Sequence, residues 1–423
     1  MRIKDINKNN YKLHLLKTKR FKTVLVKIVF WNKLKKEDLT LRNMLVNNLL
    51  FSSARYNTIR KMAIKKEELF SAELFSRNYR RGTQIITEIN LSVIDDNYSE
   101  EESLKNSIEF LFDIINNPNI KNNKFDETSF KINYEKLKSA IKREKEDSMY
   151  WCYQEFKKLI EKDDVFPDSI LGTEEELEKI TPESLYKYYK NFFENNHIDI
   201  FVVGNINFKE IEKVITNNFN PQTKDIPYSN ISTSYEKEFS ESFKKSKFNQ
   251  SKLIIGASTS SLTKHEKFYE SMIYNIILGN SPNSKLFQNV REKNSFAYNI
   301  SSSLNRLDGL FHVSAGISYK NYEQAKQEIY KQFKSMQEGK FSSKSLKDAK
   351  EVVLSIIKEV DEYPGAILDH YFNFLYLGNE TLTKQKEEIK KITKEDIVRV
   401  ANKINIDTIF LLKEGQNEKL SNQ

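Results

Sequence analysis

Cysteine and long apolar runs are scarce in this sequence. Cys152 is the only cysteine among 423 residues, so no disulfide can form within the chain, and such usage is typical of a reducing compartment. The first ten residues are polar and lack the apolar core of a signal peptide. No apolar stretch approaches the roughly 20 residues that a membrane-spanning helix needs. These absences favour a cytoplasmic protein without a membrane partner.

Histidines are few and isolated. The chain has five, namely His14, His197, His265, His312 and His370, and no two of them are spaced to share one face of a helix. His265-Glu266 lacks the second histidine of an H-E-x-x-H motif. The sequence also lacks G-x-S-x-G, Walker A and G-x-G-x-x-G elements. It therefore carries no local signature of a zinc site, a serine hydrolase or a nucleotide-binding enzyme.

The net charge of +9 arises from 68 basic and 59 acidic residues. A basic excess can indicate binding to nucleic acid or to a membrane surface. Here the lysines are spread over many predicted helices, alternate with glutamates and form no cluster with aromatic residues. We interpret the charge as a solvated surface and not as a nucleic-acid interface, and it leaves an acidic peptide or partner possible.

The chain is too long for a single ordinary core, and its two halves follow one plan. In each half, predicted strands and helices are followed by a long helical stretch and a last strand. The polar, aperiodic segment 221–248 contains Pro221 and Pro227 and predicts a linker. We expect an α+β protein with two homologous domains, 1–220 and 249–423, that arose by internal duplication.

Hydrophobic periodicity sets the predicted elements. Strand-like runs lie at 11–17, 23–31, 71–76, 84–93, 198–203, 251–258, 297–304, 310–318 and 408–412. Helical periodicity covers 39–51, 57–69, 101–116, 128–158, 173–193, 208–219, 266–278, 322–338, 343–362, 363–376 and 394–403.

One stretch combines a polar turn, a short helix and the start of a strand. It runs from Leu278 to Tyr298 and reads LGNSPNSKLFQNVREKNSFAY. It resembles the second-domain segment of the insulinase/pitrilysin family of metallopeptidases, in which L-G-G-x-x-x-S-x-L-F-x-x-V-R-E-x-x-x-x-A-Y recurs. Segments 171–181 and 191–204 are similar to that family's first domain, and the resemblance extends over most of the chain. It implies two processing-peptidase-like domains, each a mixed, mostly antiparallel sheet packed with helices.

The metal half of the family's site is missing here. The family carries H-x-x-E-H on a first-domain helix, where two histidines and a distant glutamate hold zinc and the motif glutamate activates water. In the equivalent helix Asn43 and Asn47 stand at the ligand positions and Val46 replaces the base, while Ser139-Ala140 offers no carboxylate. Amides are poor zinc ligands, and valine cannot accept a proton. The resemblance implies no cofactor in this chain and zinc in a partner subunit.

Arg291 and Tyr298 are the candidate catalytic residues. In the resembled family, an arginine and a tyrosine from the second domain face the zinc, and a zinc-lacking subunit can supply them to its partner. Peptide hydrolysis passes through an oxyanion that preorganised donors stabilise, and a guanidinium and a phenol are such donors. The alternative is that Arg291 is a helix-end charge paired with a carboxylate and Tyr298 a half-buried strand residue.

The loop before this helix is the candidate substrate-binding segment, through Gly279, Asn280, Ser281 and Asn283. A glycine-rich substrate loop of some family members is reduced here to Gly279 followed by Asn-Ser-Pro-Asn. Since Ser281 and Asn283 are also good N-cap residues, the loop could serve only to begin the helix.

Together these inferences predict a non-catalytic subunit of a bacterial heterodimeric zinc peptidase, without activity of its own. Its partner would be a homologue bearing H-x-x-E-H, and a peptide would be the substrate, in processing or degradation. The alternative is a purely structural or peptide-binding homologue with no catalytic role.

Overall fold

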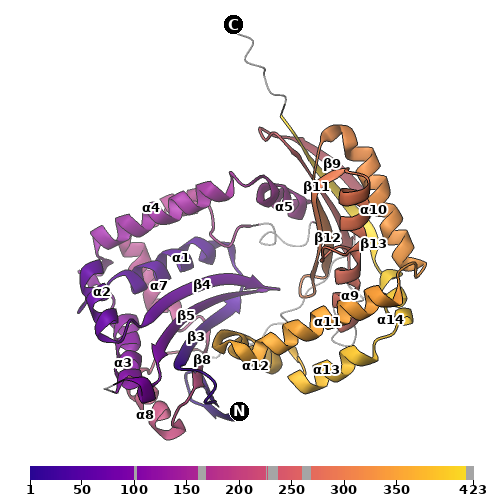
Figure 1. Cartoon of the computed structure of the whole chain (residues 1–423). Coiled ribbons are helices and arrows are strands. Elements are labelled where there is room, and N and C mark those ends of the chain that lie inside the picture. Colours follow the sequence, from indigo (N-terminus) through magenta and orange to yellow (C-terminus); the bar gives the residue numbers. More distant parts are fainter. Residues whose placement is uncertain (100–101, 161–167, 225, 227–236, 260–267, 416–423) are drawn as a thin grey trace, which may run out of the picture. The chain divides into compact units, whose positions relative to one another are not determined.

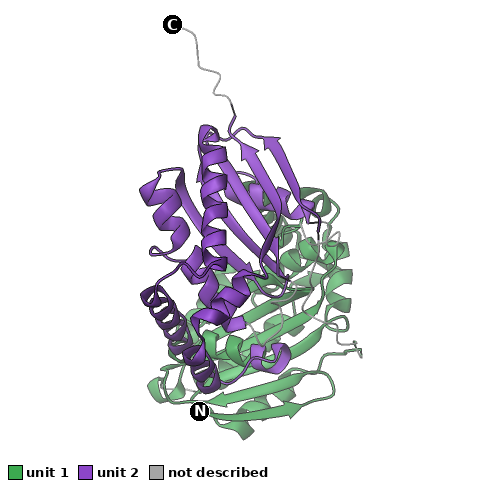
Figure 2. Cartoon of the chain, turned by 90° about the vertical axis from the view of Figure 1, so that its right-hand side faces the viewer, with its two compact units in different colours: residues 1–143, 168–229, 361–372 green, residues 144–167, 230–360, 373–423 purple. Residues whose placement is uncertain are grey.

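The computed structural model describes residues 1–99, 102–160, 168–224, 226, 237–259 and 268–415, which form two compact units (Figures 1 and 2). Unit 1 comprises residues 1–143, 168–229 and 361–372, and unit 2 comprises residues 144–167, 230–360 and 373–423. The division is therefore not a single cut along the chain. Of the expected linker, residues 225 and 227–236 lie outside the described part.

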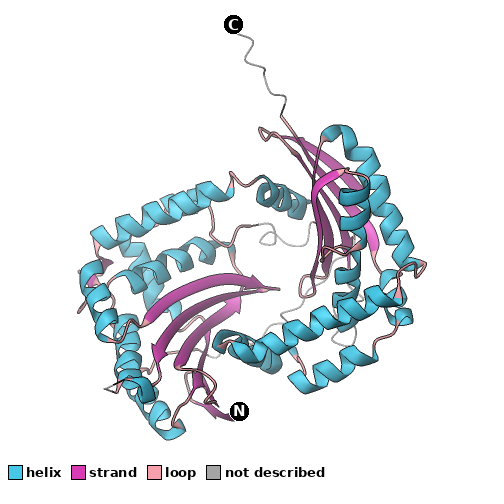
Figure 3. Cartoon of the chain, in the orientation of Figure 1, coloured by secondary structure: helices cyan, strands magenta, loops and turns pink. Residues whose placement is uncertain are grey.

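Unit 1 contains a six-stranded sheet (Figure 3). The order of its strands is β1 (Arg2–Asn7), β2 (Lys12–Lys17), β8 (His197–Gly204), β3 (Thr23–Lys33), β5 (Gln84–Ile94) and β4 (Glu73–Arg81). β2 and β8 are parallel, and the other neighbours are antiparallel. A two-stranded ribbon, β6 (Ile120–Lys121) and β7 (Lys124–Phe125), lies apart from this sheet.

Helices pack on one face of this sheet. They are α1 (Lys36–Phe51), α2 (Ile59–Glu68), η1 (Asp96–Tyr98), α3 (Ser103–Asn116), α4 (Glu127–Glu144), α6 (Glu174–Glu178), α7 (Pro182–Phe192) and α8 (Phe208–Asn218). Along β3, Val24, Val26, Ile28 and Phe30 join the core that these helices cover. The intervening residues, Lys27 among them, point to the opposite face because successive strand side chains alternate.

Unit 2 contains a five-stranded sheet. Its order is β11 (Ala297–Asn305), β12 (Leu310–Ile317), β10 (Ser251–Ser258), β13 (Asn405–Lys413) and β9 (Ser240–Lys245). The helices in the second half of the chain are α9 (Phe268–Leu278), η4 (Phe287–Lys293), η5 (Tyr319–Asn321), α10 (Tyr322–Gln337), α11 (Ser343–Glu359), η6 (Val360–Glu362), α12 (Pro364–Leu377), α13 (Leu382–Lys391) and α14 (Lys394–Ala401). None of the described helices is long and apolar enough to cross a membrane.

The two sheets share one topology. The order β2-β8-β3-β5-β4 in unit 1 corresponds to β9-β13-β10-β12-β11 in unit 2. In both, the first pair is parallel and the remaining pairs are antiparallel. The α+β class with two homologous, mostly antiparallel domains is thus confirmed. β9 lies inside the expected linker, and β1 is an addition in unit 1.

The helix expected over 128–158 is in fact two helices, α4 and α5 (Ser148–Leu159). Asp147 begins α5, because its carboxylate accepts hydrogen bonds from the amides of Met149 and Tyr150, each at 2.9 Å. α5 packs on the sheet of unit 2, where Cys152 and Phe156 share a core cluster with Ile254, Leu310, Phe410 and Leu412. Cys152 is therefore a buried apolar residue, as its aromatic neighbours in the sequence predict.

The first part of α12 packs on the sheet of unit 1 in a corresponding way, through polar contacts and through the contacts of Phe372 with Trp31 and Phe201. Lys27 donates hydrogen bonds to Asp369 at 2.6 Å and to Glu88 at 3.4 Å. Tyr371 donates to Asp5 at 2.7 Å. Charges that would be costly to bury alone are thus paired beneath this helix. Each unit is completed by a helical segment from the other half of the chain.

We expect Gly256→Ala to destabilise the packing of α5. A Cβ at Gly256 would lie 2.4 Å from Phe156 Cζ, and Phe156 is fully buried. Overpacking of this kind costs about 1–3 kcal/mol. Urea unfolding would measure the loss, with Gly365→Ala as the matched control, because a Cβ there meets nothing closer than 3.9 Å. Equal stability of the two variants would contradict this packing.

His312 lies on β12, on the face that α5 covers. Its ring centroid is 4.9 Å from that of Tyr153, and its Nδ1 is shielded from solvent without a hydrogen-bond partner among the described residues. Loss of hydration lowers the pKa of this imidazole from 6.5 to about 4. His312 is therefore neutral in the folded protein at neutral pH.

This burial predicts a pH dependence of stability. Between pH 6.5 and about 4 the unfolded chain binds a proton at His312 that the folded chain does not, so the free energy of unfolding should fall as the pH is lowered through this window. The full effect is at most about 3 kcal/mol. His312→Phe keeps the ring contact and should reduce the slope of unfolding free energy against pH. Identical slopes for the two proteins would refute the assignment.

Candidate functional site

The segment that carries Arg291 is a short helix with a wide π-type turn, η4 at Phe287–Lys293. Lys285 and Leu286 are helical and precede it, and the Ser284 Oγ before them accepts a hydrogen bond from the Phe287 amide at 3.4 Å. Neither Ser281 nor Asn283 is the N-cap, so that expectation is wrong by a few residues. Wide turns of this type frequently occur at functional sites.

Arg291 lies on the solvent side of this helix, next to the buried Val290. Its guanidinium carbon is 4.6 Å from the centre of the Phe287 ring, and its Nε is 3.5 Å from Glu292 Oε1. The side chain is 42% exposed. A carboxylate neighbour is present, as the structural alternative for Arg291 supposes, but pairs in water contribute little stability. The guanidinium can therefore exchange this partner for a ligand.

The chain leaves the helix through a tight reversal. Ser295 has a left-handed backbone with φ of 53°, and its amide donates to the Arg291 carbonyl at 3.0 Å. The Phe296 amide donates to the Val290 carbonyl at 2.9 Å. These bonds fix where β11 begins relative to Arg291.

Tyr298 is the additional residue of a β-bulge at the start of β11. Ala297 pairs with Ile317 and Asn299 with Gly316, which leaves Tyr298 without a partner in the ladder. Asn299 Oδ1 accepts a hydrogen bond from the Gly316 amide at 2.8 Å. Tyr298 is 65% exposed, and its hydroxyl makes no hydrogen bond to any described residue. The alternative that it is half-buried is therefore wrong.

Arg291 and Tyr298 thus lie in one unit with exposed side chains, and the turn at Ser295 connects them. No hydrogen bond or ion pair joins the two side chains within the described residues. Neither is enclosed in the protein interior, so each can donate to a third group.

The loop Gly279–Asn283 mostly ends α9. The amides of Gly279 and Asn280 both donate to the Asn275 carbonyl at 2.9 Å. A Cβ on Gly279 would lie 2.5 Å from Ser302 Oγ, so glycine is required by this close approach. Ser281 donates to the Ile276 carbonyl at 3.3 Å. Asn280 and Asn283 are exposed and remain available to a ligand.

On α1, Asn43 has a structural role at the expected zinc-ligand position. Its Nδ2 donates to the carbonyls of Leu39 and Ile170, both at 2.8 Å. Its Oδ1 accepts from Asn78 at 2.9 Å, and Asn78 in turn accepts from Thr87 at 2.6 Å. The side chain is 7% exposed. These bonds join α1 to β4, β5 and the segment before α6.

The other two positions of the degenerate motif differ from Asn43. Val46 is buried in the apolar interior, whereas Asn47 is partly exposed and makes no hydrogen bond through its side chain within the described part of the chain. Ser139 and Ala140 lie in α4. Among the residues that the structure describes, no three His, Cys, Asp or Glu side chains are placed to hold a metal ion. His265 lies outside the described residues.

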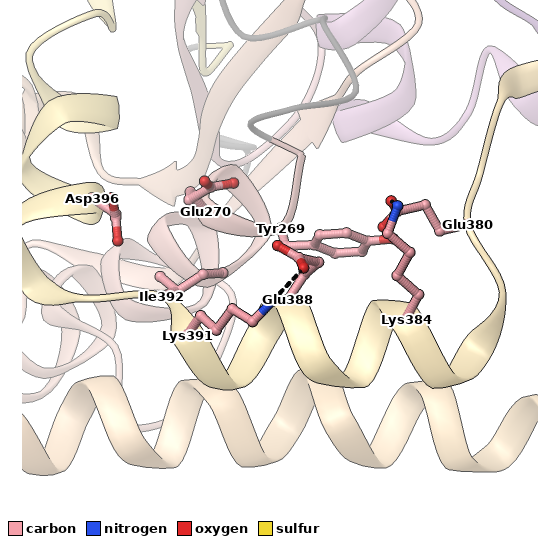
Figure 4. A pocket seen from close by; sticks show the side chains of 8 residues that line it. All are labelled: Tyr269, Glu270, Glu380, Lys384, Glu388, Lys391, Ile392 and Asp396. Atoms are coloured by element: carbon pink, nitrogen blue, oxygen red, sulfur yellow. Dashed lines mark hydrogen bonds and ion pairs between the residues drawn. The ribbon is translucent and has the colours of Figure 1, made fainter.

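Two polar hollows occur in unit 2, and the sequence indicated neither. The first, of about 440 Å³, is lined by Tyr269, Glu270, Glu380, Lys384, Glu388, Lys391, Ile392 and Asp396 (Figure 4). Its lysines are already paired, Lys391 with Glu388 at 2.8 Å and Lys384 with Glu380. Internal pairing of this kind satisfies the charges without a ligand.

The second hollow, of about 300 Å³, includes Tyr298 in its wall. The other lining residues are Asn249, Gln250, Ser318, Glu414 and Gly415. We call it the Tyr298 hollow. It could not be found from the sequence because its residues come from the ends of four strands, which only the sheet brings together.

Comparisons with known proteins agree with the fold. The family described as Peptidase M16 inactive domain matches residues 179–353. The probable inactive metalloprotease YmfF of Bacillus subtilis is 26% identical over 408 residues, which cover 95% of both chains. A conserved protein of Enterococcus faecalis superposes with a TM-score of 0.91 at 25% identity, over 98% of this chain and 99% of the other. The peptidase M16 inactive domain protein from Pseudomonas fluorescens gives 0.78 at 13% identity, over 98% and 99%.

The chain thus has the two-domain fold of insulinase-type peptidases, and the predicted resemblance to that family is confirmed. The matching family model and the relative YmfF are both described as inactive.

We expect the amide network at Asn43 to stabilise unit 1. Asn43→Ala removes three hydrogen bonds whose partners stay at least partly buried, which should cost about 2–4 kcal/mol. Asn47→Ala is the matched control and should stay within about 0.5 kcal/mol, as is usual for surface changes. Chemical unfolding of both variants measures this difference. If Asn43→Ala left the free energy of unfolding unchanged, the network would contribute nothing to stability.

Proposed function

We propose that this chain is the non-catalytic subunit of a heterodimeric zinc peptidase, in which a homologous partner carries H-x-x-E-H. The chain forms part of the substrate chamber and supplies Arg291 and Tyr298 to the substrate carbonyl. The proposal rests on a contrast between the expected zinc-ligand position on α1 and the candidate donors Arg291 and Tyr298 in unit 2. The zinc position is filled by a structural amide, whereas both donors have exposed side chains.

The chemistry divides between the subunits. In the partner, the H-x-x-E-H residues would hold zinc and would supply an activated water. As water adds to the carbonyl carbon, negative charge develops on the carbonyl oxygen and needs donors already in place. The guanidinium of Arg291 donates charge-assisted hydrogen bonds, and the Tyr298 hydroxyl donates a further one. This chain therefore acts on the transition state and does not activate the nucleophile.

Two local features support this role. The Arg291–Glu292 pair is solvent-exposed, so replacing Glu292 by a substrate oxygen costs little. The bulge at Tyr298 is maintained by Asn299 and not by the tyrosine itself, so the phenol is presented without being used in the fold. We infer a peptide as substrate, processing or degradation as the process, and the cytoplasm as the location.

The second candidate function is a structural or peptide-holding homologue with no catalytic role. The contacts of Arg291 with Phe287 and Glu292 favour it, because they give the side chain a local partner. The dependence of turnover on the two donors separates the two functions.

We expect Arg291→Ala and Tyr298→Phe each to lower kcat of the reconstituted complex about 10²–10³-fold, as for loss of an oxyanion donor. The assay follows cleavage of a quenched-fluorescent peptide by a zinc-loaded H-x-x-E-H homologue mixed with this chain. Size-exclusion chromatography checks that assembly is unchanged. The chain alone should neither cleave the peptide nor bind stoichiometric zinc.

Two matched controls accompany these variants. Lys293→Ala removes an exposed cation from the same helix, and Tyr363→Phe removes a hydroxyl from a tyrosine that is 61% exposed elsewhere. Both should keep full turnover. Full turnover in Arg291→Ala and Tyr298→Phe as well would favour the structural alternative.

A further inference from the structure

The Tyr298 hollow is a polar site formed where four strands of one sheet begin or end. Tyr298 lies at the start of β11, and Asn249 and Gln250 precede β10. Ser318 follows β12, and Glu414 follows β13. All belong to unit 2. The volume of about 300 Å³ is at the lower end for ligand sites, which suits one side chain and not a whole peptide.

Glu414 is the charged residue in this wall, and backbone amides fix its position. Its two carboxylate oxygens accept hydrogen bonds from the amides of Ser251 and Tyr319, each at 3.3 Å. The Glu414 amide donates to Ser251 Oγ at 3.0 Å. No ion pair with a described cation neutralises this carboxylate. The wall therefore presents one negative charge at a fixed position.

Two lysines on the strands beside Glu414 donate hydrogen bonds to groups other than its carboxylate. Lys413 donates to the Tyr319 hydroxyl at 2.9 Å, and Lys252 donates to Gln250 Oε1. Neither lines the hollow. The carboxylate of Glu414 thus lacks a cation of this chain to balance it, within the described residues.

The remaining wall supplies acceptors and an aromatic ring. The side chains of Asn249, Ser318 and Tyr298 make no hydrogen bond to any residue that the structure describes. The bulge at Asn299 directs Tyr298 away from the core. A carboxylate, neutral oxygens and a ring face together are the chemistry that holds an ammonium or guanidinium group.

We propose that the Tyr298 hollow binds a cationic group of the peptide substrate, with Glu414 as its counter-ion. That the ligand is a peptide rests on the proposed function, whereas the charge that it must carry rests on the hollow itself. A lysine or arginine side chain and a free peptide N-terminus both supply the required cation. The hollow would place that group beside Tyr298 and so select substrates by charge.

Binding to the full-length chain alone tests the proposal without a partner or zinc. Calorimetry would compare three pentapeptides: one capped at both ends with a central lysine, the same peptide with norleucine, and the norleucine peptide with a free N-terminus. We expect the lysine peptide to bind about 3- to 10-fold more tightly than its capped norleucine counterpart, as for one partly exposed ion pair. Tight binding of the third peptide would assign the site to the N-terminus instead of the side chain.

Two variants change the charge of the hollow in opposite directions, one by removing a carboxylate and one by adding it. Glu414→Gln keeps an oxygen for one backbone amide and should abolish the preference for lysine. Asn249→Asp adds a second carboxylate at an exposed lining residue and should strengthen it several-fold. Asn405→Asp adds the same charge at an exposed residue at the start of β13, outside the hollow, and serves as the control.

Three outcomes would overturn the proposal. They are equal binding of the two capped peptides, no gain in Asn249→Asp, and an equal gain in Asn405→Asp. If circular dichroism shows that Glu414→Gln is unfolded, the binding of the lysine peptide to Asn249→Asp still tests the proposal. Because turnover is not measured, failure here leaves the role of Arg291 and Tyr298 untouched. Loss of turnover dependence would likewise leave the hollow in place.

Discussion

The hydrogen bond from the Gly316 amide to Asn299 Oδ1 determines how this chain presents Tyr298. A β-bulge leaves a backbone donor without a ladder partner, and the Asn299 side chain takes that place. A Cβ on Gly316 would lie 2.3 Å from Asn299 Oδ1, so a larger residue there would displace the Asn299 side chain from this hydrogen bond. Through this one contact the phenol faces solvent beside Glu414, while the rest of β11 keeps its regular pairing with β12.

In unit 1, the expected zinc-ligand position has a structural role instead of presenting a side chain to a ligand. At Asn43, hydrogen bonds to two carbonyls and a second amide occupy the position where the resemblance predicts a zinc ligand. At the two other positions predicted for the motif, Val46 is buried and Asn47 is partly exposed. The Asn43 network gives α1 a structural role, because it joins this helix to the strands of the sheet.

Much of this was readable in the sequence. Apolar runs at β3, β5, β8 and β10 predicted buried strands, and the Leu278–Tyr298 motif predicted the position of both donors on a helix and a strand. Most of what failed depends on long-range contacts. β9 reads Ser-Glu-Ser-Phe-Lys-Lys and becomes a strand only by pairing with β13, and the Tyr298 hollow depends on four strand ends that no local pattern connects. The break between α4 and α5 is different, because it depends on Asp147 as a local N-cap.

Each unit contains a helical segment from the other half of the chain, and this affects when unit 1 can be completed during synthesis on the ribosome. The six strands of unit 1 are complete once Gly204 has been synthesised, yet Asp369 and Tyr371, which cover Lys27 and Asp5, emerge far later. During that interval a nascent chain carries an uncovered sheet face that includes the charged Lys27 and the aromatic Trp31 and Phe201. The first half therefore cannot reach its final form until α12 has been synthesised, and a product that stalls before this point would be a natural target for chaperones and proteases.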